Sequence, residues 1–163
     1  DGGGKLFIKM SIEIVEFTLE LAPHFGRLNR AWIEKDYAIE PPEEEMLARP
    51  VSVIERGGGI IFARDGARVV GTGGLEPLPE GNFEIIKMAV EPDCRGLGIG
   101  QLLIERLMAM AIKRGATWVR IETASALAPA NGLYRKNGFG LAREQHSLHG
   151  YSRADMFYEK RVG

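Results

Sequence analysis

The stretch from Phe83 to Thr123 constrains the fold most, because it combines two strand patterns with one helix pattern. The apolar run at 83–90 predicts a strand. Apolar residues then recur at helical spacing over 99–111, and Gly115 follows as a helix stop. Alternation at 118–123 predicts a second strand. Strand, helix and strand in this order predict a βαβ unit with parallel strands and a right-handed crossover.

A glycine-rich loop, Arg95-Gly96-Leu97-Gly98-Ile99-Gly100, joins the first strand to the helix. Glycines let a backbone approach an anion closely, and the first-turn N–H groups of a helix have no intrahelical partner. The loop also follows the carboxyl end of its strand, where open α/β sheets bind ligands. We therefore expect a pyrophosphate there. A glycine-rich turn that merely starts a helix is the alternative.

Glycine spacing argues against two familiar phosphate loops. A Walker A loop ends in Gly-Lys-Ser/Thr, but Gly100 is followed by Gln101 and Leu102. A dinucleotide-binding loop needs a third glycine where this chain has Gln101 or Leu103. A nucleotide-binding module of Rossmann or flavodoxin type is further disfavoured by the hairpin-rich N-terminal half. The remaining pattern is Arg-x-x-Gly-x-Gly between a strand and a helix.

That pattern resembles the acyl-CoA pyrophosphate loop of the GNAT superfamily of N-acyltransferases. A second segment, Ala130-Asn-Gly-Leu-Tyr-Arg-Lys-Asn-Gly-Phe139, resembles the family's Ala-x-x-Leu-Tyr-x-Lys-x-Gly-Phe. The resemblance is strong over residues 83 to 140 and looser elsewhere. It implies an α/β (α+β) fold, with a mixed, mostly antiparallel central sheet of about seven strands, about four flanking helices and a βαβ acyl-CoA-binding core.

Patterns outside this stretch agree with that order of elements. We expect strands at 12–17, 60–64, 68–75, 141–148 and 154–161, and helices at 25–37, 43–47 and 129–137. Asp65-Gly66 is a hairpin turn signal between two of these strands. Met10 resembles a native start, so residues 1–9 are expected to be a disordered leader or a remnant of cloning, with residues 10–163 forming one domain.

Composition argues against several partners. Lys and Arg number 21 against 22 Asp and Glu, which leaves a formal charge of −1, and no basic run supports nucleic acid binding. No apolar stretch is long enough to span a membrane and no signal peptide is visible. The single Cys94 fits a reducing compartment. We expect a cytoplasmic protein without nucleic acid or membrane partners, and a homodimer is left open.

The resemblance also implies the chemistry: an amine attacks the thioester of acetyl-CoA directly, in a ternary complex. Tyr134 falls on the motif position that protonates the departing thiolate, although it could be a core tyrosine. A phenol with an ordinary pKa of ~10 keeps its proton at neutral pH. Glu84 is the candidate base, placed by alternation on one face with Ile86, Met88 and Val90. Glu122, His146 and His149 are reserve candidates for the base.

The same resemblance assigns the acetyl-CoA site without a metal. Backbone N–H groups near Met88 would face the acyl carbonyl at a point where two strands splay, Asn131 would bind the pantetheine arm, and Arg135 or Lys136 would reach a phosphate or remain solvated. The expected acetyl-CoA-binding residues are Met88, Ala89, Val90, Arg95, Gly96, Leu97, Gly98, Ile99, Gly100, Gln101, Asn131, Tyr134 and Lys136.

The acceptor is expected to be a small-molecule or peptide amine, which the sequence does not identify. An acidic segment, formed by Glu34, Asp36, Glu40 and Glu43–Glu45, would favour a cationic amine if it lined the pocket. A solvated helix surface is the plainer interpretation of that segment. A non-catalytic acyl-CoA sensor is the alternative function, because it would keep the phosphate loop while losing the groups that handle protons.

Overall fold

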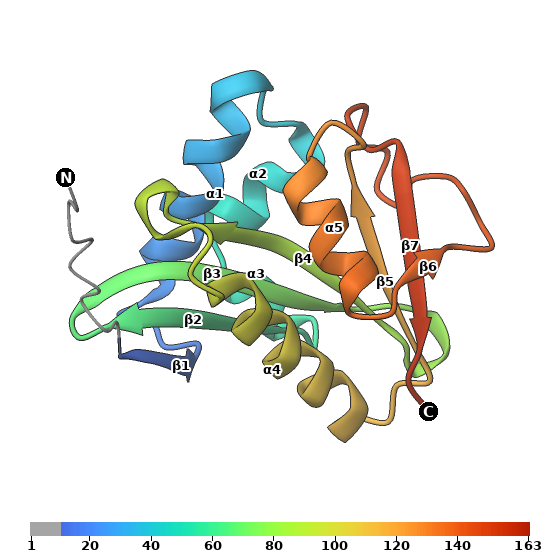
Figure 1. The fold of residues 1–163 in the computed structure, drawn as a ribbon, viewed down its shortest axis with the longest axis horizontal. Coiled ribbons are helices and arrows are strands. Elements are labelled where there is room, and N and C mark those ends of the chain that lie inside the picture. Colours follow the sequence, from blue (N-terminus) through green and yellow to red (C-terminus); the bar gives the residue numbers. More distant parts are fainter. Residues whose placement is uncertain (1–10) are drawn as a thin grey trace, which may run out of the picture.

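Residues 11–163 are described by a computed structural model, in which seven strands form one mixed sheet in the order β1-β2-β3-β4-β5-β7-β6. Figure 1 shows this sheet with β1 at one edge and the short β6 at the other. The strands are β1 Ile12–Glu16, β2 Gly59–Asp65, β3 Arg68–Pro77, β4 Phe83–Val90, β5 Trp118–Thr123, β6 Gly140–Leu141 and β7 Met156–Arg161. Only β4 and β5 pair in parallel. The expected mixed, mostly antiparallel sheet is confirmed.

Helices cover both faces of the sheet. Among residues 11–163 they are α1 Ala22–Asp36, α2 Pro41–Ala48, α3 Val51–Glu55, α4 Ile99–Lys113 and α5 Ala128–Lys136. One buried apolar cluster joins the sheet to α4 and α5, and a second joins its other face to α1, α2 and α3. The sequence patterns missed only α3, which is a five-residue helix too short to show a clear period. The predicted leader at 1–9 lies outside the described residues.

β4 and β5 pair over only three residues and then separate. Their parallel register runs from Phe83–Val119 to Ile85–Ile121. Beyond Ile85, β4 continues to Val90 with β3 as its ladder partner and without β5. A bulge adds one residue to β4 here, with Lys87 at φ 52°. Because a bulge bends the strand that carries it, the diverging strands leave an opened edge on the β5 side of β4.

The expected strand at 141–148 is wrong. In this part of the chain only Gly140 and Leu141 pair with β7, whose other neighbour is β5. Residues 142–155 form a loop that runs towards β4 and α2. The loop is held by side chains instead of by a strand ladder, since the Arg120 guanidinium donates to the carbonyls of Glu144 and His146. Side-chain hydrogen bonds therefore satisfy backbone groups that a neighbouring strand would otherwise pair.

No helix within residues 11–163 has the length and apolar character required to cross a membrane.

Candidate functional site

The glycine-rich loop leads from the end of β4 into α4. A short 3₁₀ turn, Pro92–Cys94, precedes Arg95, and the loop then passes through Gly96 at φ 77° and Gly98 at φ 85°. A Cβ atom added to either glycine would meet nothing within 4 Å. Neither position is therefore crowded. Glycine is favoured there because the backbone is left-handed, where other residues are strained.

The N–H groups of residues 96 to 101 have no hydrogen-bond acceptor within residues 11–163. The first hydrogen bond of α4 is donated by the Leu102 N–H to the Gly98 carbonyl, and no side chain caps this end of the helix. Arg95 is exposed beside these groups. Free N–H groups at a helix N-terminus together with an exposed guanidinium form an arrangement that suits an anion such as pyrophosphate.

The start of α4 packs closely against α5. A Cβ atom on Gly100 would lie 3.1 Å from Leu133 Cδ2. The side-chain amides of Gln101 and Asn137 donate to each other at 2.8 Å in both directions. These contacts fix α5 beside the glycine-rich loop, with Lys136 exposed at its end.

Asn131 is buried in α5 and its side-chain groups bond within the protein. Its amide nitrogen donates to the carbonyls of Ala124 and Leu127 at 2.9 Å. Its oxygen accepts from the Tyr158 hydroxyl, also at 2.9 Å. Both N–H donors are therefore already used, so the geometry gives Asn131 a role in fixing α5 and leaves it no free donor for a pantetheine arm.

Tyr134 also belongs to α5, and its side chain is buried in the core. Its ring meets Phe139 and Tyr158 edge-on, with centroid separations of 6.4 and 5.9 Å. Burial raises the pKa of Tyr134 to about 12 and the neighbouring Tyr158 adds to the effect. The phenol therefore stays protonated at neutral pH, so it is a proton donor there and not a proton acceptor.

Alternation along β4 does not continue through the bulge. Ile86 packs with the α1–α2 cluster, whereas Met88 and Val90 pack with the α4–α5 cluster. The expectation that Glu84 shares one face with Met88 and Val90 is therefore wrong, because the extra residue at Lys87 inverts the pattern. Glu84 keeps the face of Ile86, on the opposite side from Tyr134.

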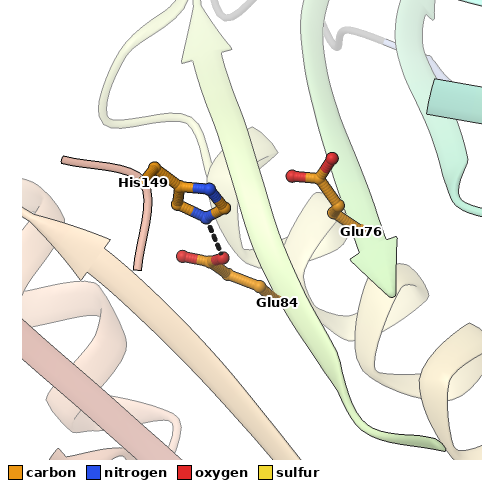
Figure 2. A group of neighbouring side chains, drawn as sticks. All are labelled: Glu76, Glu84 and His149. Carbon is orange, nitrogen blue, oxygen red and sulfur yellow. Dashed lines mark hydrogen bonds and ion pairs between the residues drawn. The ribbon is translucent and has the colours of Figure 1, made fainter. Parts of the chain in front are cut away.

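Glu84 lies against His149, which the loop 142–155 brings to β4 from 65 residues away. His149 Nε2 is 2.5 Å from Glu84 Oε2. Figure 2 shows the two side chains facing each other, with this contact dashed. Glu84 is 1% exposed and burial raises its pKa, which His149 partly opposes. The hydrogen bond that His149 makes to Glu84 raises the pKa of His149, against a smaller opposing effect of burial. The sequence named both residues as base candidates but could not place them together.

Glu76 joins this pair from β3. Glu76 is the register partner of Glu84, and one ligand atom from each of Glu76, Glu84 and His149 lies within 4.8 Å of the others (Figure 2). Such a group has the composition of a metal site. Glu76 also accepts a hydrogen bond from Arg56 at 2.8 Å, and Glu84 is engaged by His149. Arg56 and His149 therefore already offset much of the negative charge of the two glutamates.

The other two reserve bases have different partners. Glu122 accepts hydrogen bonds from the Ser147 hydroxyl at 2.6 Å and from the Leu148 N–H at 2.7 Å, so it tethers the loop. The His146 side chain is 63% exposed and approaches only Glu144. Neither side chain contacts the Glu84 carboxylate directly, as His149 does.

The acidic segment after α1 divides into two parts. Glu43 is 0% exposed and is paired with Lys87 and Arg153, while Glu40 accepts from Ser152 and Arg153. Glu34, Asp36, Glu44 and Glu45 are exposed. The solvated interpretation therefore holds for the second group only. Lys87 was missed as a structural residue, although a lysine within the apolar run 83–90 was a visible signal.

Comparisons with known proteins agree with this geometry. The chain is 35% identical over 101 residues to an IAA acetyltransferase from Azospirillum brasilense, a match covering 61% of this chain and 65% of that protein. The matched part spans less than two thirds of the length of the curated relatives.

Two solved structures share the fold. A GNAT-family acetyltransferase from Staphylococcus aureus MU50 superposes with a TM-score of 0.83 at 19% identity, covering 94% of this chain and 100% of that one. The paia N-acetyltransferase from Thermoplasma acidophilum, solved in complex with coenzyme A, gives 0.74 at 19% identity with coverages of 94% and 100%. The model of the acetyltransferase (GNAT) family matches residues 22–139. With the fold, the loop and this match over most of its length, the chain belongs to the GNAT family of acetyltransferases.

Proposed function

We propose that this protein transfers the acetyl group of acetyl-CoA directly to a primary amine, within a ternary complex. The observation that carries the proposal is the opened edge of β4 beyond Ile85, which leads straight into a loop of unpaired N–H groups at the start of α4. A long ligand that carries both amides and phosphates could pair with the first and place its anionic end on the second.

Several residues support acetyl-CoA binding in this position. Arg95 and the N–H groups of Gly96 to Gln101 would hold the pyrophosphate, and Lys136 is an exposed cation on the adjoining helix. The backbone of Met88, Ala89 and Val90 would meet the pantetheine arm and the acyl carbonyl. Donors fixed in a sheet need no reorganisation when charge develops on that carbonyl oxygen.

Proton handling divides between the two faces of the sheet. Glu84 and His149 lie on the face of α1 and α2, and would draw a proton from the amine. Tyr134 lies on the face of α4 and α5, and would protonate the CoA thiolate. An amine entering from one face and acetyl-CoA from the other would meet at the opened edge of β4. Holding two reactants in this way supplies much of the catalysis.

Isothermal titration calorimetry with acetyl-CoA tests the binding half of the proposal. Arg95→Ala removes a charge-assisted hydrogen bond to phosphate, for which ~1.5–3 kcal/mol corresponds to roughly tenfold to hundredfold weaker binding. Gly98→Val should also weaken binding, because it strains the loop at φ 85° and adds bulk beside the N–H groups.

Matched controls separate loss of the site from loss of the fold. Gly66→Val places the same side chain at another open glycine of positive φ, in the β2–β3 turn. Arg106→Ala removes an exposed arginine from α4. Both controls should bind acetyl-CoA as the wild type does. Undiminished affinity in Arg95→Ala and Gly98→Val would place the donor elsewhere.

A further inference from the structure

His149 covers the carboxylate of Glu84 on its accessible side. The His149 side chain is 22% exposed, whereas that of Glu84 is 1% exposed. The ring contacts one oxygen of that carboxylate, Oε2. Of the two groups that could accept a proton, the imidazole is therefore the more accessible to an amine.

The loop that carries His149 is fastened on several sides. Arg120 of β5 holds the carbonyls of Glu144 and His146, at 3.1 and 2.6 Å. Glu122 holds Ser147 and Leu148, and Glu40 of the N-cap of α2 accepts from Ser152. Tethers on both sides of His149 reduce the freedom of its ring. A group used for proton transfer needs such fixed geometry.

We propose that His149 is the residue that accepts the proton of the acceptor amine, and that Glu84 positions it by accepting the hydrogen of Nε2. This tautomer leaves the lone pair of Nδ1 free for the proton. The inference rests on the proposed acetyl transfer and deepens it, because it gives the direct contact with the amine to His149 and makes Glu84 a positioning residue.

The proposed acetyl transfer balances in protons without a further reactant. The acceptor ammonium loses one proton to Nδ1, and His149 later releases it to solvent. The free amine then attacks the thioester carbon, the carbon–sulfur bond breaks, and the thiolate takes a proton from Tyr134. The second proton lost by the amine nitrogen restores Tyr134. The products are the acetylated amine, CoA thiol and one released proton.

Charges around His149 favour a cationic acceptor. Carboxylates face it from three strands, namely Glu76 on β3, Glu84 on β4 and Glu122 on β5, and all three raise the pKa of His149. Tyr151 of its own loop lies beside the ring, with centroids 5.4 Å apart. Lys87 also lies over the Tyr151 ring, but its charge is paired with Glu43. Arg153 lies over the same ring and is likewise paired with Glu43. The three carboxylates therefore favour an ammonium group nearby and stabilise the imidazolium that forms.

A proton suits this cluster better than a metal ion. The 2.5 Å contact uses one ring nitrogen and one carboxylate oxygen for each other, and Arg56 engages Glu76. A metal would have to displace these partners, whereas a proton on Nδ1 leaves every one of them in place.

The kinetic test uses the most active amine from a panel of polyamines, amino acids, aminoglycosides and peptides, with CoA thiol release as the readout. His149→Gln should lower kcat by about 10²-fold or more, as expected for a lost general base, and should remove the acidic limb of the pH profile. Glu84→Gln should move that limb to lower pH, because the imidazole loses the carboxylate that raises its pKa. His146→Gln, an exposed histidine of the same loop, should leave rate and profile unchanged.

Rescue distinguishes proton transfer from a structural role. Added imidazole should restore turnover to His149→Ala in proportion to its free-base concentration. Failure of rescue together with a persistent acidic limb in His149→Gln would overturn the inference while leaving acetyl transfer intact. If the wild type binds acetyl-CoA but none of the amines in the panel causes it to release CoA, the proposed function is overturned, and the inference with it.

Nitrogen-15 NMR tests the tautomer without any acceptor. The inference requires Nε2 to carry the hydrogen and Nδ1 to titrate above the ordinary histidine range, with a lower pKa in Glu84→Gln. A hydrogen on Nδ1 of the neutral ring would overturn it.

Discussion

Replacing Glu43 by glutamine removes the only negative charge that contacts both Lys87 and Arg153 in the described part of the chain. Glu43 is fully buried, and the side chains of Lys87 and Arg153 are 6% and 9% exposed. Burial alone would raise the pKa of Glu43, but hydrogen bonds from Arg153, the Glu40 N–H and Lys87 lower it from 4.5 to about 2. The carboxylate is therefore much better stabilised in the folded protein than in the unfolded chain.

The size of the effect follows from that difference in pKa. About 2.5 pH units at ~1.36 kcal/mol per unit correspond to about 3.4 kcal/mol of stability. Because the folded pKa is the lower one, this stability is fully present above the unfolded value of 4.5 and is lost as the pH falls from there through about 2. Breaking a buried ion pair from one side independently costs ~3–5 kcal/mol, which agrees.

Urea unfolding at pH 7 measures the loss directly. Glu43→Gln should lower the free energy of unfolding by about 3 kcal/mol at pH 7. In this variant the free energy of unfolding should also fall less steeply between pH 4.5 and pH 2 than it does in the wild type. Glu44→Gln, one residue further along α2, breaks an exposed pair with Arg30 and should cost at most ~1 kcal/mol. A loss of less than ~1 kcal/mol in Glu43→Gln would refute the account of the cluster.

Three further substitutions separate chemistry from packing. Tyr134→Phe should lower kcat by about 10²-fold with nearly unchanged acetyl-CoA affinity, because it removes only a proton donor; unchanged turnover at saturating substrates would exclude the acid role. Gly26→Ala should destabilise the protein by ~1–3 kcal/mol in urea, since its Cβ would lie 2.5 Å from the Leu47 carbonyl oxygen. Gly132→Ala in α5 meets nothing within 4 Å and should stabilise by ~0.4–1 kcal/mol; a loss there would show that the helix needs the glycine.

The conformation of the glycine-rich loop was predictable because its signal is local. Glycines at 96 and 98 indicate a left-handed backbone, which both residues adopt. The apolar residues of α4 recur at helical spacing directly after them. The strand before it, the strand after it and the short helix α5 are also set by neighbouring residues. These elements match the predictions within a few residues.

The contact between Glu84 and His149 was not predictable in the same way. His149 reaches Glu84 only because Arg120 and Glu122 hold a loop where alternation favoured a strand, and no local pattern reports contacts 65 residues apart. The bulge at Lys87 inverted the face assignment beyond Ile86, since one inserted residue reverses a period of two. Glu43 resembled a solvated helix acid until its partners Lys87 and Arg153 were placed beside it.

An N-acetyltransferase must make acetyl-CoA react with an amine. The most direct test measures CoA thiol release from acetyl-CoA with each member of the amine panel, together with mass spectrometry of the amine. We expect release that requires one class of cationic primary amine and yields its N-acetyl product. Release that is equal without any amine, or none at all from protein that binds acetyl-CoA, would contradict the account and favour an acyl-CoA sensor.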